Sequence, residues 1–293
     1  METEEKIDTE PVVVSKSKRI WSVILDIVLF TVGFILLMNL AVLISFIFSE
    51  TSSEGESPSL FLLIQNQVLM LVSVCVSAWL VLKYRNLPFS RLGLSWAGCG
   101  KSLLYGALFV ILLYVVGFGL SLLLGVVEVT SVIFSPASLL LNLLFFFLVA
   151  VSEELLGRGF ILGRMLDEGI HKYVALFISA MLFSLMHLFN PNFALVPFLN
   201  ILLAGIFLGA SYIYTRNLSF PIALHWFWNW IQGPVLGYKV SGNEFSSESL
   251  LVLHLPEENL INGGTFGFEG SILCSFLLIL GTILILNRYR RSH

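Results

Sequence analysis

The sequence predicts an all-α, polytopic membrane protein in which about eight transmembrane helices enclose an intramembrane cavity. Of its 293 residues, 57% are hydrophobic and only 12% are charged. That balance lies far outside the range of soluble domains. Apolar runs long enough to cross a bilayer also recur along the whole chain.

Taken in order, the apolar runs cover residues 21–48, 59–82, 102–126, 138–166, 173–189, 193–214, 218–237 and 270–287. Each is interpreted as one helix, because a backbone in lipid must satisfy its own hydrogen bonds. The chain then divides into a disordered cytoplasmic tail (1–19), helices 1–3 with their loops (20–137), a core of helices 4–7 (138–238), an extracytoplasmic loop (239–269) and a last helix with a basic tail (270–293).

Basic residues fix the expected orientation, because cytoplasmic loops carry an excess of Lys and Arg. With the N-terminus inside, only Lys239 falls outside. The basic residues on or toward the inner side are then Lys6, Lys16, Lys18, Arg19, Lys83, Arg85, Arg91, Lys101, Arg158, Arg164, Lys172, Arg216, Arg288, Arg290 and Arg291. We therefore expect both termini in the cytoplasm.

Three charges stand inside the fourth apolar run, at Glu153, Glu154 and Arg158. An ionisable side chain near the bilayer centre costs roughly 2.5 to 3.5 kcal/mol on insertion scales, so this cluster needs a reason. On a helix Glu154 and Arg158 share a face and can pair, whereas Glu153 is turned about 100° away and stays available. A purely structural ion-pair knot between helices is the alternative.

Two further polar pairs follow, Phe183-x-x-x-His187 in the fifth run and His225-x-x-x-Asn229 in the seventh. If the fourth helix continues to Asp167, Glu153 and His187 lie at matching depths, ~21 and ~22 Å from the inner helix ends. His225 and Asn229 share one face at their i, i+4 spacing.

This set of groups can carry out hydrolysis of a peptide bond by water. Glu153 can act as general base, and His187 can orient the water or share its proton. His225 and Asn229 can donate hydrogen bonds to the oxyanion of a tetrahedral intermediate. Each histidine, taken singly, could instead be a buried structural residue that a backbone carbonyl satisfies.

In this order and spacing the residues resemble the three motifs of the type II CAAX prenyl endopeptidase and bacteriocin-processing (CPBP, also called Abi) family of intramembrane proteases. The matching positions, over about residues 139–232, are Glu153-Glu154-x-x-x-Arg158, Phe183-x-x-x-His187 and His225-x-x-x-Asn229. The resemblance implies an all-α fold of eight helices around a catalytic cavity that opens to the cytoplasm.

By motif position, the resemblance implies that Glu153 activates water together with His187. It implies that His225 and Asn229 form the oxyanion site. The pair of Glu154 with Arg158, and Phe183, would support these catalytic residues. We expect an integral protein of a prokaryotic plasma membrane. Its partners would be membrane lipid and a membrane-associated protein or peptide substrate, without nucleic acid.

A metal remains an alternative, because Glu153, His187 and His225 could hold Zn²⁺ with one open position, as in a His₂Glu catalytic site. The HExxH spacing of many zinc proteases is absent from the sequence. The sequence therefore favours a mechanism without a cofactor.

Two other classes of protein compete with the protease. A non-catalytic immunity or scaffold protein of the same family would have no need to keep all four polar catalytic positions. A proton-coupled transporter could use the Glu and His residues as a relay. Transporters often show paired repeats and broken helices, and the sequence shows neither.

Overall fold

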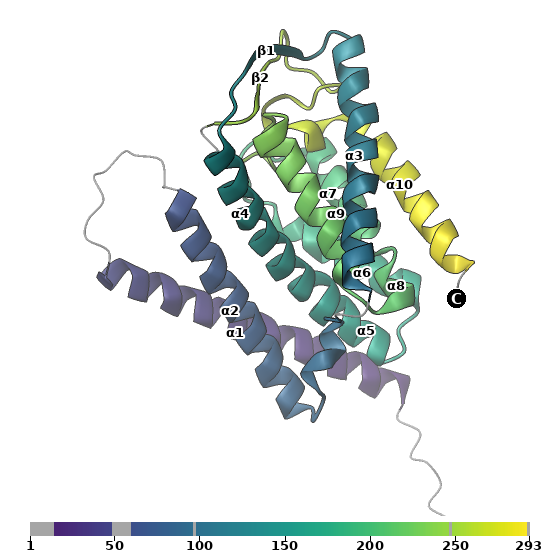
Figure 1. The fold of residues 1–293 in the computed structure, drawn as a ribbon. Coiled ribbons are helices and arrows are strands. Elements are labelled where there is room, and N and C mark those ends of the chain that lie inside the picture. The colour runs from purple at the N-terminus through teal and green to yellow at the C-terminus, as the bar shows by residue number, and fades with distance from the viewer. Residues whose placement is uncertain (1–14, 49–59, 96–97, 246–247, 292–293) are drawn as a thin grey trace, which may run out of the picture.

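The computed structural model describes residues 15–48, 60–95, 98–245 and 248–291. The chain folds into a bundle of helices with little sheet (Figure 1). In order, its α-helices are α1 (Lys16–Phe48), α2 (Leu60–Tyr84), α3 (Cys99–Leu123), α4 (Pro136–Glu154), α5 (Gly163–Asp167), α6 (Lys172–Met186), α7 (Leu195–Gly209), α8 (Tyr212–Thr215), α9 (Ser219–Trp230) and α10 (Ile272–Arg290).

Shorter elements complete the described chain. Two segments are π-helical, η2 (Leu155–Leu162) and η3 (Ile231–Val235), and the 3₁₀ turns are η1 (Phe89–Leu92), η4 (Gly264–Phe266) and η5 (Phe268–Gly270). An antiparallel pair of strands is formed by β1 (Glu128–Val132) and β2 (Leu251–His254).

The predicted all-α polytopic membrane protein is confirmed. Six helical segments of the described chain are long and apolar enough to cross a membrane: Lys16–Ile44, Leu60–Tyr84, Cys99–Leu123, Pro136–Asp167, Leu195–Thr215 and Ile272–Arg290. The two remaining predicted runs correspond to the shorter α6 and to α9 with η3. The first helix begins at Lys16, so the last four residues of the predicted tail are helical, and residues 1–14 lie outside the described part.

The fourth span combines α4, η2 and α5 in one run, Pro136–Asp167. Its π-helical segment begins directly after Glu154, and all eight of its residues are buried. Such widened turns are rare in helices and frequently lie at functional sites. The sequence predicted the run but not its π-helical stretch.

Two tryptophans fix α9 against α4. Nε1 of Trp226 donates to the backbone carbonyl of Leu143 at 2.8 Å, and Nε1 of Trp230 donates to that of Leu139 at 3.0 Å. Donors and acceptors are each four residues apart, so the two bonds set the register of one helix on the other. The third motif on α9 is thereby held beside the first motif on α4.

Close packing joins α6 to α7, as the spacing of Gly205 and Gly209 predicts for a face of small residues. A Cβ atom added at Gly205 would lie 2.7 Å from Ala180, and one added at Gly209 would lie 2.5 Å from Leu176. The backbones approach each other only because both positions lack a side chain.

A buried ion cluster ties α1 to the rest of the bundle. Asp26 is fully buried, and its carboxylate accepts from Nε of Arg85, directly after α2, at 2.6 Å and from Nη2 of Arg164 on α5 at 2.8 Å. The predicted orientation counted both arginines only as basic residues on or toward the inner side, and it did not predict their contact with Asp26.

The strand pair lies at the end of the molecule opposite α5, above the start of α4 (Figure 1). Glu128 pairs with His254 and Val132 with Leu251. The sequence predicted loops here. A two-stranded sheet is marginal alone and depends on its surroundings, which a local pattern does not show.

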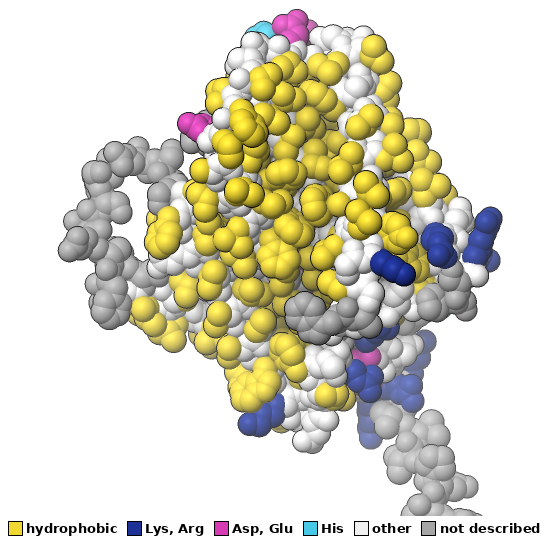
Figure 2. All heavy atoms as spheres, viewed as in Figure 1, with side chains coloured by type: hydrophobic (Ala, Val, Ile, Leu, Met, Phe, Trp, Pro, Cys, Tyr) yellow, Lys and Arg dark blue, Asp and Glu magenta, His cyan; other side chains and the backbone are white. Residues whose placement is uncertain are grey.

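Charge is distributed along the axis of the bundle. Figure 2 shows Lys and Arg side chains gathered near one end, a broad apolar surface above them, and acidic and His side chains at the end that carries the strands. This is the pattern of an integral membrane protein.

Candidate active site

A cavity of about 260 Å³ lies among α2, α4, α6, α7 and α9. Its wall contains all four residues for which catalytic roles were predicted: Glu153, His187, His225 and Asn229. Phe183 lines it as well. The three sequence motifs, more than 70 residues apart from first to last, therefore meet in one polar pocket within the bundle.

The two adjacent glutamates point in different directions, as their helical positions predict. Glu154 is fully buried and its Oε1 accepts a hydrogen bond from Nη1 of Arg158 at 2.7 Å. Glu153 lines the cavity with 19% of its side chain exposed. One carboxylate is therefore part of the packing, and the other faces the space where a substrate would lie.

Arg158 is braced from three sides. Besides the bond to Glu154, its Nη2 donates to the backbone carbonyl of Gly205 on α7 at 3.1 Å. Its guanidinium also lies 4.4 Å from the ring centre of Phe183, a cation–π contact. The first motif thus docks on α7 at the place where the glycine face brings α6 and α7 together.

His225 has a partner that the sequence did not predict. Its Nδ1 lies 2.9 Å from Oε1 of Glu154, and its Nε2 lies 3.7 Å from Oε2 of Glu153. A carboxylate paired with an arginine only accepts hydrogen bonds, so Nδ1 carries the hydrogen. Nε2 then faces the cavity, and it can donate to an oxyanion only when the ring is the doubly protonated imidazolium.

His187 is set in the complementary way. Its Nδ1 lies 2.8 Å from the backbone carbonyl of Phe183, which can only accept, so Nδ1 is the donor. In the neutral ring Nε2 is then an acceptor, as a group that receives a hydrogen bond from water must be. The ring of Phe183 lies between both imidazoles, at 4.8 Å from His187 and 6.1 Å from His225.

Glu269 is a further carboxylate in the cavity wall, and the sequence analysis missed it. It is buried, with 5% exposed, and it accepts from Nε1 of Trp228 at 3.1 Å and from the backbone N and Oγ of Ser241 at 2.7 and 2.9 Å. The sequence placed it among the acids of the loop 239–269. Its position directly before the last apolar run was the only available signal.

The three residues of the zinc alternative lie in the wall of one cavity. Glu153, His187 and His225 all line the cavity, yet no group of three or more His, Cys, Asp and Glu among the described residues is placed to hold a metal ion. Nδ1 of each histidine is bound, to Phe183 O and to Glu154, so Nε2 is the ring nitrogen that remains for a ligand in the cavity.

Fold and cavity together define a polytopic membrane protein with a hydrolase-like set of carboxylate, imidazole and carboxamide groups inside the bundle. Residues 135–231 match the model of the family described as type II CAAX prenyl endopeptidase Rce1-like. This segment contains all three motifs, and the match confirms the predicted family resemblance over about a third of the chain. It is a family of proteases. Comparisons with curated proteins and with solved structures give no match.

Proposed function

We propose that this protein is an intramembrane endopeptidase that hydrolyses a peptide bond of a membrane-associated protein or peptide. The observation that carries the proposal is the convergence of Glu153, His187, His225 and Asn229 on one cavity. It is supported by the family of proteases that the segment 135–231 matches.

In the proposed mechanism Glu153 is the general base. It takes a proton from a water that His187 orients through Nε2, and the water oxygen forms a bond to the carbonyl carbon of the substrate. The proton held by Glu153 then passes to the leaving amine as the carbon–nitrogen bond breaks. Both products leave with atoms and charges balanced, and Glu153 returns to its ionised form.

The charge that develops on the carbonyl oxygen needs donors in place before the reaction. Asn229 supplies its amide N–H, and the imidazolium of His225 supplies Nε2–H. Glu154 supports this role, because its carboxylate holds Nδ1 of His225 at 2.9 Å and leaves Nε2 directed toward Glu153.

The proposal has no metal and no other cofactor. The chain's own groups provide a base, a water-orienting acceptor and two oxyanion donors, and none of these steps requires a Lewis acid. We further propose that the protein lies in a prokaryotic plasma membrane with both termini in the cytoplasm. The basic end of the bundle in Figure 2 supports this orientation.

The test is a comparison of membrane-fraction proteins between cells with the wild-type chain and cells with Glu153→Gln. Glu128→Gln, at an exposed position on β1, is the matched control. A precursor should accumulate with Glu153→Gln and not with the control. If a folded, normally abundant Glu153→Gln protein causes no accumulation, the chain is not a protease of this kind, and a scaffold or immunity function takes its place.

A further inference from the structure

We infer that the cavity opens toward the end of the molecule opposite the basic residues, and that its substrate is an extracytoplasmic, membrane-adjacent segment of a membrane-anchored protein. The substrate class rests on the proposed function, whereas the direction of the opening rests on geometry alone. In this fold, cytoplasmic termini and a cavity open to the cytoplasm exclude each other.

The first observation is the level of the wall residues on the three motif helices. On α4 the wall includes Phe146, Val149 and Glu153, but nothing from the fourteen residues that follow, up to the end of α5 at Asp167. On α6 it begins at Phe183, near the end of the helix, and on α9 at His225. The chain direction of α4 is toward the basic end, whereas α6 and α9 run away from it. The wall residues on all three helices therefore lie in the half of the bundle that is farther from the basic end.

The second observation is the source of the remaining wall. Five residues come from the segment between η3 and α10: Val240, Ser241, Asn243, Phe245 and Glu269. This segment contains β2 and so belongs to the strand-bearing end of the molecule. It reaches down to the end of α6, where Nδ2 of Asn190 donates to the backbone carbonyl of Ser241 at 2.9 Å. The cavity thus lies directly beneath the strand-bearing end.

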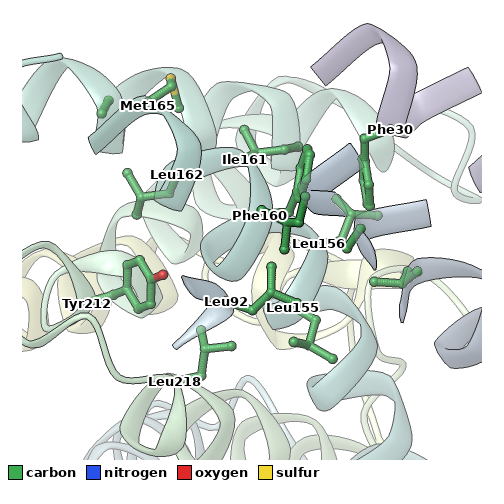
Figure 3. Close-up of a cluster of buried hydrophobic side chains, with 14 of the residues drawn as sticks. Phe30, Leu92, Leu155, Leu156, Phe160, Ile161, Leu162, Met165, Tyr212 and Leu218 are labelled. Carbon is green, nitrogen blue, oxygen red and sulfur yellow. The ribbon is translucent and has the colours of Figure 1, made fainter. Parts of the chain in front are cut away.

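The third observation is the packing of the residues that follow Glu154 along the fourth span. They belong to a buried apolar cluster, drawn in Figure 3, in which the ring of Phe160 stacks on that of Phe30 at 4.2 Å. Its side chains are at most 5% exposed: Phe30, Leu92, Leu155, Leu156, Phe160, Ile161, Leu162, Met165, Tyr212 and Leu218. A peptide arriving from the basic end would have to displace this core.

The fourth observation is where the cavity wall reaches the surface of the molecule. Met186 at the last position of α6 is the most exposed wall residue, with 44% exposed. His187, Asn190 and Asn243 beside it are half-buried. The mouth therefore lies around the end of α6, which is the end farthest from Lys172.

The orientation of the protein in the membrane then determines which compartment this mouth faces. The opposite end carries Arg85, Arg91, Arg164, Lys172 and Arg216, four of them within or beside buried or half-buried ion pairs. Lys and Arg are retained on the cytoplasmic side of membrane proteins. The mouth accordingly faces away from the cytoplasm, and a cytoplasmic C-terminal tail is the wrong substrate for it.

Cysteine accessibility tests the direction. Met186→Cys and Asn243→Cys report on the mouth, native Cys99 at the start of α3 reports on the basic end, and Glu128→Cys reports on the strand-bearing end. A membrane-impermeant maleimide should label the two mouth cysteines and Glu128→Cys in intact cells, and Cys99 only in inside-out vesicles. Labelling of the mouth cysteines from the Cys99 side only, or from neither side, overturns the inference.

The same labelling repeated in the Glu153→Gln background does not depend on activity, so it separates this inference from the proposed function. New N-termini that appear in membrane fractions of wild-type cells but not of Glu153→Gln cells then locate the cleavage sites. They should map to extracytoplasmic positions next to membrane spans. Cleavage at cytoplasmic tails refutes the substrate class, whereas the absence of any Glu153-dependent cleavage refutes the proposed function and leaves the labelling result to decide the direction.

Discussion

Oε1 of Glu154 binds both Nη1 of Arg158, at 2.7 Å, and Nδ1 of His225, at 2.9 Å. A single carboxylate oxygen therefore connects the first motif with the third across two helices. Such shared partners make residues act as a unit, so that the effects of single substitutions do not add.

The mechanism predicts that Glu153→Gln abolishes cleavage and leaves the fold and substrate binding intact. Glutamine keeps the size and a hydrogen-bonding oxygen but cannot take a proton from water, so the chemical step alone fails. Cleavage of a precursor found in the proteomic comparison and the thermal stability of the purified protein measure the two effects. Normal cleavage by Glu153→Gln would end the proposed mechanism.

Asn229→Ala should be less severe, because His225 remains as the second oxyanion donor. Loss of one donor typically lowers kcat by about 10²- to 10³-fold. The decrease should appear in kcat and not in KM, because the oxyanion forms only in the transition state and the tetrahedral intermediate and is absent from the bound substrate. A change confined to KM would instead make Asn229 a binding residue.

Arg158→Ala should reduce stability more than Glu153→Ala. Its loss leaves the buried Glu154 without its permanent cation and with His225 as the remaining partner, a defect of up to roughly 3 to 5 kcal/mol, and it also removes the bond to the carbonyl of Gly205. Glu153→Ala removes a partly exposed carboxylate that no ion pair with a permanent cation holds. Melting temperatures in detergent compare the two variants, and equal values would contradict this assignment.

The protease should work without a metal. Purified protein that has been stripped with a strong chelator is expected to cleave at the rate of untreated protein, and added Zn²⁺ should not raise that rate. Loss of activity on stripping, with recovery on addition of Zn²⁺, would show that Glu153 and the histidines bind metal after all.

Glu269→Ala should lower both stability and activity, although Glu269 lies outside the matched segment. The substitution leaves Nε1 of Trp228 and both donors of Ser241 without their acceptor, and a buried unpaired polar group costs about 1 to 3 kcal/mol. Trp228 stands next to Asn229, so the effect should reach catalysis. Glu257→Ala, at an exposed position of the same segment, is the control and should behave as wild type.

Much of the fold was predictable because lipid permits few solutions for a backbone. Each of the eight predicted apolar runs contains a helix, six helical segments of the described chain are long and apolar enough to span a membrane, and polar residues inside three of the runs marked the cavity. Helical spacing also predicted correctly that Glu154 pairs with Arg158 and that Glu153 does not.

What the sequence missed depends on contacts between distant segments. Helical spacing fixes the face and the depth of a side chain but not the neighbour it meets, so the bond between Glu154 and His225, 71 residues apart, was not predicted. For the same reason Asp26 and Glu269 went unnoticed as buried partners. The widened turn after Glu154 has no local pattern that would distinguish it from a regular helix.

The cavity wall combines the segment that matches the family model with residues from outside it. The groups with proposed catalytic roles lie within residues 135–231, whereas Ser241, Asn243, Phe245 and Glu269 come from beyond that segment. Within the described part of the chain, Asn243 and Phe245 make no contact with the proposed catalytic groups that would tie them to the chemistry, whereas Glu269 is joined to α9 through Trp228. Changes at positions such as Asn243 and Phe245 can therefore reshape the chamber during evolution while Glu269 is kept, and their exchange between related chains would be a direct route to a new specificity.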